Sequence, residues 1–532
     1  MIAALFPLLL VAPLALAHPG QHRPSRNLSA LNRYASTDRD PNLPALGIWP
    51  LPQSAAYAAG GAAAACLPPY FSLQCSGVLC PEPLPAALDR YASLLLFAGS
   101  PSDAGSAAWI SALNVTVRAD AQLGLGVSEN YTLTLPSGAG TDTVATIVAD
   151  TQWGALRAIE SFSQLFAWSG RGTPIAYCTA SASIVIEDYP RYPWRGLLID
   201  SSRHFLPTSA VLATLDAMSY NKLNTLHWHL LDDQSWSLYS QRYPNFTLGG
   251  SYCSDCFYTH ADLKRVVDYA WERGIRVIPE FDMPAHAAIW GKGYPALEIS
   301  CPGGESLLNP IDDGTEWSIY TVLDNLLSEL APIFYTADVI HLGGDEVESM
   351  DCWNQSAPVR QFMVDKGLAT LDALRNYFQD KIQSIASSHA LRTMFWEEVF
   401  DKGYNVHPTT IVDVWLSFKE VDAVVAAGNN VVVSYGLYLD QQLPAGPTHY
   451  FWCVIFMPLS LVLDRASRTL RELTFTHPTH QQPRNAHFFH RADTWMNFWD
   501  NGSTNQSPLV LGESLSQWGE QGACLGAPLI RP

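Results

Sequence analysis

The stretch His341-Leu-Gly-Gly-Asp-Glu-Val347 decides how this chain is interpreted. It follows the apolar run Ala337-Asp-Val-Ile340, which is typical of a buried strand. The glycine pair permits a tight exit from that strand with close backbone approach, so Asp345 and Glu346 stand at its carboxyl end. In a (β/α)8 barrel, catalytic groups lie at this end of the strands. The motif alone also fits a helix start, where two acids complement the helix dipole.

The chain beyond residue 195 alternates short apolar runs with helical segments. We expect strands at residues 196–200, 223–227, 275–281, 339–342, 393–396, 411–415, 431–434 and 509–511. We expect helices at about 208–220, 261–273, 317–331, 357–364, 370–388 and 418–427. Eight strands that alternate with helices predict a (β/α)8 TIM barrel, an α/β fold, over residues 195–532.

A smaller domain is expected before the barrel, over residues 47–186. Period-two runs, a β-branched run and a helical pattern lie at 114–117, 131–135, 145–148 and 153–166. Strands followed by a helix predict an α+β accessory domain. The Ala/Gly-rich stretch from Ala55 to Ala65 is low in complexity and is expected to have no fixed structure. The proline-containing segment from Ile186 to Trp194 is the expected boundary between the domains.

The first residues indicate export. Residues 1–17 are apolar and end in Ala15-Leu16-Ala17, which predicts a signal peptide with an A-x-A cleavage site. Residues 18–46 are polar and are expected to form a linker or pro-segment. Sequons, each an acceptor for N-glycosylation, begin at Asn27, Asn114, Asn130, Asn245, Asn354 and Asn501. We therefore expect a secreted glycoprotein, extracellular or associated with the cell wall.

The ten cysteines are expected to be mostly paired in that oxidising compartment. Cys301 and Cys352 flank the strand that leads to the acid pair and are the pairing we predict first. Cys253-Ser-Asp-Cys256 predicts a small disulfide hairpin, because a zinc site needs a second pair of ligands that the sequence does not offer nearby.

Charge and composition limit the partners. The formal net charge is −19, which disfavours nucleic acid and anionic membrane surfaces. No segment after the leader has the roughly 20 apolar residues of a membrane span. The chain has 17 Trp, 22 Tyr and 21 Phe. Most of these rings are expected in the core, but aromatic faces also suit the apolar face of a sugar.

Polar or aromatic residues follow nearly every expected barrel strand. In strand order they are Asp200, Arg203 and His204; His227, His229, Asp232 and Asp233; Asp282 and His286; Asp345 and Glu346; Trp396, Glu397 and Glu398; Trp415; Tyr438 and Asp440; Trp518 and Glu520. Packing alone does not predict polar or aromatic residues at so many strand ends. Any single histidine among them could equally be a structural residue whose hydrogen bonds are satisfied. Aromatic walls with acids and no metal-ligand cluster predict glycoside hydrolysis without metal or cofactor.

The position of the two acids narrows the mechanism. Ordinary retaining glycosidases place two carboxylates about 5–5.5 Å apart on either side of the scissile bond. The neighbouring residues Asp345 and Glu346 cannot easily straddle a bond in this way. A substrate-assisted route, in which the 2-acetamido oxygen of the sugar attacks C1, removes the need for a protein nucleophile.

Six blocks of the sequence, in order, resemble the β-N-acetylhexosaminidases of glycoside hydrolase family 20, and within them the secreted fungal type. The blocks are Arg195–Phe205, Tyr220–Asn224, His227–Asp233, Glu280–Pro284, His341–Val347 and Trp396–Phe400. The resemblance covers most of residues 47–452. It implies an exo-acting enzyme that removes terminal non-reducing N-acetylglucosamine or N-acetylgalactosamine with retention, through an oxazolinium intermediate. Chitooligosaccharides and glycans are the implied substrates, as in chitin degradation, and a homodimer is left open.

The resemblance also implies roles for single residues. Glu346 would be the general acid and then the base, with a raised pKa, and Asp345 would orient the acetamido group. Arg203, with Asp440 and Glu520, would bind the sugar hydroxyls. The remaining substrate-binding residues would be Tyr438 at the acetamido oxygen, Trp396, Trp415 and Trp518 around the N-acetyl pocket, and Asp232 and His286 behind the acid pair.

Two parts of the barrel depart from the family pattern. Residues 453–491 join an apolar run, a basic run and several histidines without a strand or helix period, and we interpret them as an atypical insertion. Residues 522–532 are short and Gly/Pro-rich, so we expect a truncated C-terminus. These departures support the alternative hypothesis of a catalytically impaired, carbohydrate-binding product.

Overall fold

The computed structural model describes residues 48–57, 65–77, 79–95, 108–136, 142–168, 177–179, 183–301, 306–435, 437 and 509–517. The expected signal peptide, the linker, the insertion at 453–491 and the short C-terminus lie outside these residues.

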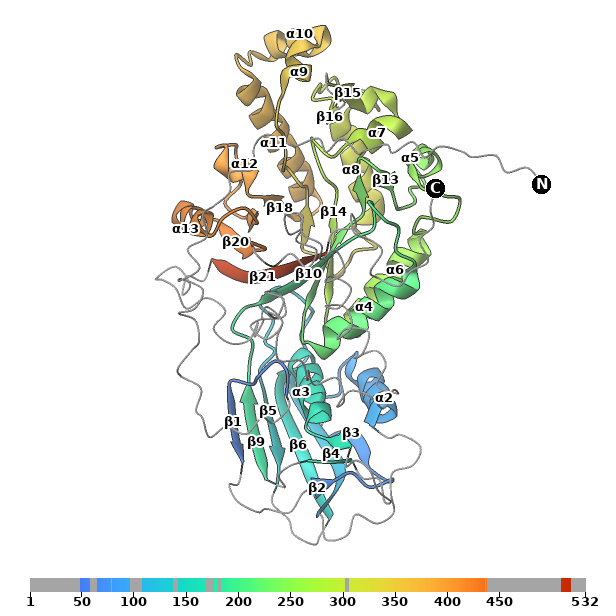
Figure 1. The fold of residues 1–532 in the computed structure, drawn as a ribbon, viewed down its shortest axis with the longest axis vertical. Coiled ribbons are helices and arrows are strands. Elements are labelled where there is room, and N and C mark those ends of the chain that lie inside the picture. The colour runs from blue at the N-terminus through green and yellow to red at the C-terminus, as the bar shows by residue number, and fades with distance from the viewer. Residues whose placement is uncertain are drawn as a thin grey trace, which may run out of the picture. The chain divides into compact units, whose positions relative to one another are not determined.

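The accessory domain consists of one mixed sheet with two helices on one of its faces (Figure 1). Its strand order is β1-β9-β5-β6-β4-β2-β8-β7, and β3 pairs with β4. The strands are β1 Ser54–Tyr57, β2 Ala65–Cys66, β3 Ser72–Cys75, β4 Ala108–Ala119, β5 Tyr131–Leu135, β6 Asp142–Thr151, β7 Ala167–Trp168, β8 Tyr177–Cys178 and β9 Ile184–Asp188. The helices are α2 Leu84–Leu95 and α3 Gln152–Gln164, whose apolar sides pack toward the sheet.

Parallel strands in the described part of the chain close a barrel in the order β10-β11-β14-β17-β18-β19-β20-β21. They are β10 Trp194–Asp200, β11 Thr225–His229, β14 Arg276–Glu280, β17 Val339–His341, β18 Arg392–Trp396, β19 Ile411–Val414, β20 Asn430–Val433 and β21 Val510–Gln517. Residues of β10, β11 and β14 are buried throughout, because the strands of a parallel barrel are covered on both faces. The expected fold class, a (β/α)8 barrel with a smaller N-terminal domain, is confirmed.

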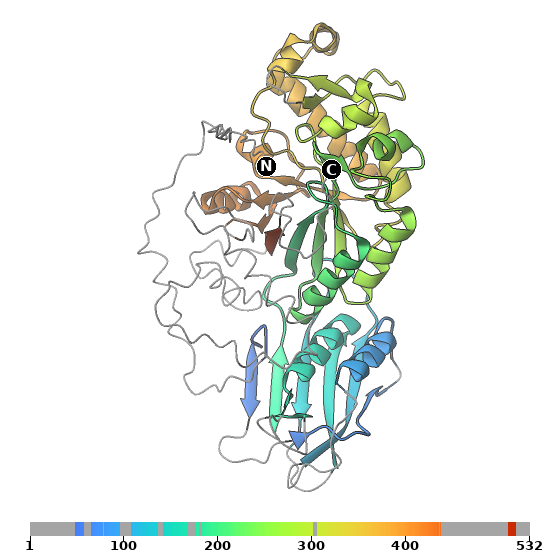
Figure 2. The ribbon, with the colours of Figure 1, turned by 45° about the vertical axis from the view of Figure 1, so that its right-hand side comes forward.

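In the described part of the chain, helices follow the barrel strands from β10 to β19 (Figure 2). They are α4 Thr208–Tyr220, α5 Pro244–Gly250, α6 His260–Trp271, α7 Ala288–Gly293, the 3-10 helix η2 Pro295–Leu297, α8 Ile319–Leu330, α9 Asp351–Gln355, α10 Ala357–Lys366, α11 Leu371–Ser388, α12 Glu398–Asp401 and α13 Phe418–Ala427. Two short hairpins complete the domain, β12 Leu231–Asp232 with β13 Ser235–Trp236, and β15 Glu298–Ser300 with β16 Ser306–Leu308. Among the helices described, none is long and apolar enough to cross a membrane.

Four disulfides are present in the described part of the chain. The predicted pair Cys301–Cys352 ties the β15–β16 hairpin region to α9, and the predicted hairpin pair Cys253–Cys256 is present. Two further bonds, Cys66–Cys178 and Cys75–Cys80, lie in the accessory domain. Both pairings proposed from the sequence are confirmed.

Two local expectations are wrong. Part of the Ala55–Ala65 stretch is not irregular, since β1 pairs antiparallel with β9 along its whole length. Backbone pairing with a strand far along the chain outweighs the weak local preference of an alanine-rich segment. The second barrel strand begins at Thr225 rather than Leu223, because the backbone N–H groups of Asn221 to Leu223 bond back to the end of α4.

A buried ion cluster joins the accessory domain to the barrel. Glu129 Oε2 lies 2.7 Å from Arg157 Nε of α3 and 2.6 Å from Arg195 of β10. Arg157 also donates to the carbonyl oxygens of Arg273 and Gly274, which precede β14. Burial acts to raise the pKa of Glu129, but the two guanidiniums outweigh it and lower the pKa to about 2. The cluster therefore fixes the end of the barrel opposite to the acid pair.

Replacing Glu129 by alanine should lower the free energy of unfolding by about 3–5 kcal/mol, because two buried guanidiniums lose the carboxylate that they share. The pKa of Glu129 is depressed in the folded state, so its contribution is complete above the ordinary value of 4.5 and is lost as the pH falls toward 2. Urea unfolding at pH 7 and pH 3 measures both effects.

Arg118→Ala is the matched control, because Arg118 pairs with Asp150 at 2.7 Å but its side chain is 64% exposed. An exposed pair of this kind contributes about 0–1 kcal/mol. Equal losses of stability in the two variants would contradict the assignment of the buried cluster.

Candidate active site

The loop after β17 carries the acid pair on a backbone that needs both glycines. Gly343 and Gly344 have φ values of +61° and +99°. A Cβ at Gly343 would collide with the Asp282 carboxylate, and Gly344 N–H donates to Asp282 Oδ1 at 3.2 Å. Glu346 itself has a φ of +49°, an uncommon conformation for a residue with a side chain. The expected tight exit with close backbone approach is confirmed.

Asp345 and Glu346 meet at one imidazole. His286 Nε2 lies 3.5 Å from Asp345 Oδ2 and 3.3 Å from Glu346 Oε2. The Glu346 side chain is 57% exposed, whereas that of Asp345 is 13% exposed. Asp345 Oδ1 is buried and has no hydrogen-bond partner among the described residues. The two carboxylates thus share a neighbour but differ in their contact with solvent.

The pKa values of the two acids are shifted in opposite directions. The hydrogen bond from His286 lowers the pKa of Glu346, and burial opposes it only in part. Burial raises the pKa of Asp345, and the charges of Glu280 and Glu346 act in the same direction. The expectation of a raised pKa for Glu346 is therefore wrong, because its carboxylate is more than half exposed and faces a histidine. Burial alone would lower the pKa of His286, but Asp345, Asp232 and Glu346 raise it well above its ordinary value.

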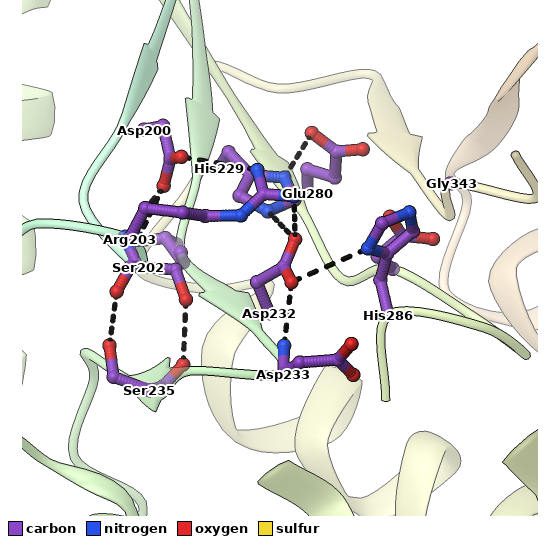
Figure 3. Close-up of polar contacts among 12 residues, drawn as sticks. Asp200, Ser202, Arg203, His229, Asp232, Asp233, Ser235, Glu280, His286 and Gly343 are labelled. Carbon is purple, nitrogen blue, oxygen red and sulfur yellow. Dashed lines mark hydrogen bonds and ion pairs between the residues drawn. The ribbon is translucent and has the colours of Figure 1, made fainter. Parts of the chain in front are cut away.

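Behind His286 lies Asp232 of β12 (Figure 3). Asp232 Oδ1 is 3.4 Å from His286 Nδ1, and its Oδ2 is 2.9 Å from His229 Nε2 and 2.7 Å from the Arg203 guanidinium. Burial acts to raise the pKa of Asp232, but the bonds from His229 and His286 outweigh it. Arg203 also pairs with Asp200 Oδ2 at 3.1 Å. The expected cluster of Arg203, Asp232 and His286 beside the acid pair is present.

The strand register brings a second set of polar side chains together. His229, Glu280 and His341 are direct partners across β11, β14 and β17. The buried carboxylate of Glu280 lies 2.7 Å from His229 Nδ1 and 3.0 Å from His341 Nδ1. Trp396 Nε1 donates to it at 3.0 Å. Through Glu280 and His229, the indole of Trp396 is therefore connected to Asp232 and the acid pair.

Two of the three tryptophans predicted for the N-acetyl pocket lie in the described residues. Trp396 is buried and Trp415 is half-buried. The Trp396 ring lies tilted against the rings of His227 and His341. Trp415 Nε1 donates to Glu398 Oε2 at 2.9 Å, and its backbone N–H donates to Glu397. Tyr438, Asp440, Trp518 and Glu520 lie outside the described residues.

Among the residues that the structure describes, two groups of side chains have donor atoms close enough for a metal ion, within 4.8 Å of one another. They are His227, Glu280 and His341, and Asp232, Asp282 and His286. In the first group Glu280 lies 2.9 Å from His227 Nε2 and 3.0 Å from His341 Nδ1. Both distances are those of direct contacts between Glu280 and the two histidines, so no metal ion is needed to explain the spacing of this group.

The sequence assigns no site role to Glu280 and marks Glu398 only as one of the polar residues that follow the barrel strands. Glu280 ends a strand that is buried throughout, and a charged residue in such a strand is itself a signal. The pattern does not show that Glu398 turns toward Trp415.

Comparison with known proteins places both parts of the chain. The model of the "Glycosyl hydrolase family 20, catalytic domain" matches residues 192–523, and the model "beta-acetyl hexosaminidase like" matches residues 48–165. Beta-hexosaminidase subunit A1 of Dictyostelium discoideum is 32% identical over 443 residues, which are 82% of this chain and 73% of that protein. Beta-hexosaminidase subunit beta of Homo sapiens is 39% identical over 60% of this chain and 57% of its own length. The chain thus spans less than two thirds of the human relative.

Solved structures share the fold. A chitobiase of Flavobacterium johnsoniae superposes with a TM-score of 0.64 and 25% identity, over 89% of this chain and 65% of that chain. An exo β-N-acetylglucosaminidase of Vibrio harveyi, in complex with N-acetylglucosamine, gives a TM-score of 0.64 with 21% identity, over 89% and 70% of the two chains. The second likeness is one of fold alone.

Proposed function

The chain belongs to glycosyl hydrolase family 20, and on that premise we propose that it is an exo-acting β-N-acetylhexosaminidase. It removes terminal non-reducing N-acetylglucosamine or N-acetylgalactosamine from chitooligosaccharides or glycans, with retention of configuration. The observation that carries the proposal is the pair Asp345 and Glu346, adjacent in the chain and both within 3.5 Å of His286 Nε2. Two neighbouring carboxylates cannot lie on both sides of the scissile bond, so the 2-acetamido oxygen of the substrate is the group that attacks C1.

In the first step the protonated Glu346 gives its proton to the glycosidic oxygen. The acetamido oxygen attacks C1 as the bond from C1 to the leaving group breaks, and an oxazolinium ion forms. Asp345 accepts the acetamido N–H, for which its buried Oδ1 is available, and its charge stabilises the cation. In the second step water attacks C1 while Glu346 takes its proton, and the acetamide is restored in a product of β configuration.

The remaining site residues bind the sugar. Arg203 is held by Asp200 and Asp232 and offers its guanidinium to the ring hydroxyls, to which the resemblance also assigns Asp440 and Glu520. Trp396 and Trp415 form walls of the N-acetyl pocket. By the resemblance Trp518 completes these walls and Tyr438 binds the acetamido oxygen.

His286 keeps a proton available to Glu346 across a wide range of pH. The pair shares one dissociable proton, which rests mainly on His286 in the free protein because the pKa of His286 is raised and that of Glu346 is lowered. The pair therefore loses this proton only as the pH rises through the raised pKa of the histidine. Protonated Glu346 is the minor form from which the reaction proceeds.

His286→Ala should shift the alkaline limb of the kcat/KM profile to lower pH. Glu346 alone then holds the proton and loses it near the ordinary pKa of a glutamate, about 4.3. At pH 7 we expect kcat/KM to fall by about 10²-fold, in the range found for proton-transfer groups. If kcat/KM fell equally at every pH and the alkaline limb stayed at its wild-type pH, this role of His286 would be contradicted. His389→Ala, which removes an exposed pairing with Asp324, is the matched control and should leave the profile unchanged.

A thiazoline that mimics the cyclised intermediate tests the proposed function itself. We expect hydrolysis of an aryl β-N-acetylglucosaminide and competitive inhibition by the thiazoline, because the bicyclic mimic matches the transition state better than the substrate does. Turnover without such inhibition would overturn the substrate-assisted mechanism. An inactive protein that still binds N-acetylglucosamine would favour a binding product instead.

We also propose that the protein is secreted and glycosylated, and that it is of the secreted fungal type within its family. Support comes from the apolar leader at residues 1–17 and from exposed sequon asparagines at Asn130, Asn245 and Asn354. Expression through a secretory route, followed by mass spectrometry of the medium and treatment with an N-glycosidase, measures both properties.

A homodimer is also part of the proposal, and several relatives are named as subunits. Sedimentation of the purified chain measures its oligomeric state.

A further inference from the structure

Helix α12 lies between the two loops that carry Glu346 and Trp415. From α12, Val399 packs so closely on Gly344 that a Cβ there would collide with its side chain. Lys402, which directly follows α12, donates from Nζ to the carbonyl oxygen of Val347 at 2.7 Å. The loop of the acid pair is thus held against this helix on both sides of Glu346.

Glu398, the first residue of α12, holds the second loop through its carboxylate. Its Oε2 accepts the indole N–H of Trp415 at 2.9 Å. The helix that carries Glu398 is itself held on the loop of Glu346 by Val399 and Lys402. The two loops follow β17 and β19, and Glu346 and Trp415 are about 70 residues apart in the chain. The separation between the acid and the second tryptophan is therefore set through α12 and the Glu398 side chain.

We propose that Glu398 is a positioning residue that fixes the Trp415 wall relative to Glu346, and so sets the size of the acyl pocket that the substrate must fill. This inference rests on the proposed function. The reacting oxygen belongs to the acyl group of the substrate, so a wall that moves outward lets the group sit away from C1. Loss of a near-attack arrangement of this kind lowers kcat more than it raises KM.

The electrostatic surroundings argue against a purely structural role. Burial raises the pKa of Glu398 to about 7, and the charge of Asp345 acts in the same direction. Asp345 and Glu346 face it from the loop after β17, Trp415 from the loop after β19, and Glu397 and Asp401 are its neighbours in the chain. A folded-state pKa above the ordinary value means that ionised Glu398 costs stability as the pH rises. The hydrogen bond that it accepts from Trp415 accounts for a carboxylate at this position.

The test compares substrates that differ only in the acyl chain. Aryl β-glucosaminides with N-acetyl and N-propionyl groups are assayed with wild type, Glu398→Ala, Glu398→Gln, Trp415→Phe and the Glu398→Ala/Trp415→Phe double variant. One added methylene in a tight pocket is discriminated by about 10-fold or more. We expect the ratio of kcat/KM for acetyl over propionyl to fall to about 2-fold in Glu398→Ala, mainly through kcat.

The other variants separate positioning from general damage. Glu398→Gln keeps an oxygen acceptor and should retain more of the ratio than Glu398→Ala. The double variant should have the ratio of the more affected single variant, because both changes break the same contact. Asp401→Asn, at the other end of the same helix, is the matched control and should keep the wild-type ratio.

An unchanged acyl ratio in Glu398→Ala, with wild type active, would overturn the inference and leave the proposed function intact. Additive effects of the two single changes would overturn it as well. A wild-type protein that neither turns over the acetyl substrate nor binds the thiazoline would overturn the proposed function, and this inference with it.

Discussion

Replacing Glu346 by glutamine is expected to lower kcat on an N-acetylglucosaminide by about 10³-fold, within the range of a general acid that acts again as the base. The amide can neither donate the proton to the leaving oxygen nor take one from water. The change is nearly isosteric and the side chain is 57% exposed, so the fold should be retained. Thermal unfolding and steady-state kinetics on one preparation measure both.

The leaving group makes this prediction sharper. A dinitrophenyl glycoside leaves without a proton, so the first step of the variant should be largely restored with it, and hydrolysis of the intermediate should become rate-limiting. An equal loss with good and poor leaving groups would show that Glu346 is not the acid. Glu348→Gln is the matched control, since Glu348 is an exposed carboxylate two residues further on, and it should leave kcat unchanged.

Asp345→Asn should have an effect of similar size for a different reason. The variant loses the charge that faces the developing oxazolinium, and removal of one preorganised electrostatic group costs about 10²–10³-fold in kcat. Binding of free N-acetylglucosamine, which carries no such charge, should change far less. The measurement is therefore kcat together with the dissociation constants of the sugar and of the thiazoline.

Although Asp345→Asn should lower kcat, it should not lower the thermal stability of the protein. Burial raises the pKa of Asp345, so the ionised side chain costs stability at every pH above its ordinary value, and the neutral amide removes that cost. We expect an unfolding temperature at pH 7 equal to or above that of wild type. A lower unfolding temperature with a proportional loss of activity would indicate that Asp345 acts through structure alone.

The sequence predicted the barrel well because its strands are short, apolar and separated by helical periods. The acid pair could be located for the same reason, since the end of a barrel strand is a defined place. Cys301 and Cys352 could be paired because they flank that strand. In these cases the information lies within one segment or in its position along the chain.

The parts that could not be predicted depend on contacts between distant segments. Glu280 is hydrogen-bonded to His229 of β11 and Trp396 of β18 and lies 3.0 Å from His341 Nδ1 of β17, and no local pattern shows that these meet. The lowered pKa of Glu346 follows from the placement of His286, whose own φ is +51°. Short helices such as α5, α7 and α12 have too few residues for a recognisable period. Tertiary packing decides all of these features.

The most direct test of the proposed mechanism changes the nucleophile, which is the acetamido oxygen of the substrate. Wild-type protein is assayed with aryl glucosaminides that carry N-acetyl, N-fluoroacetyl, N-difluoroacetyl and N-trifluoroacetyl groups. Fluorine withdraws electrons from the carbonyl oxygen with little change in size, so kcat/KM should fall steadily along the series. A series of equal kcat/KM values would mean that the acetamido oxygen does not attack C1, and would contradict the account.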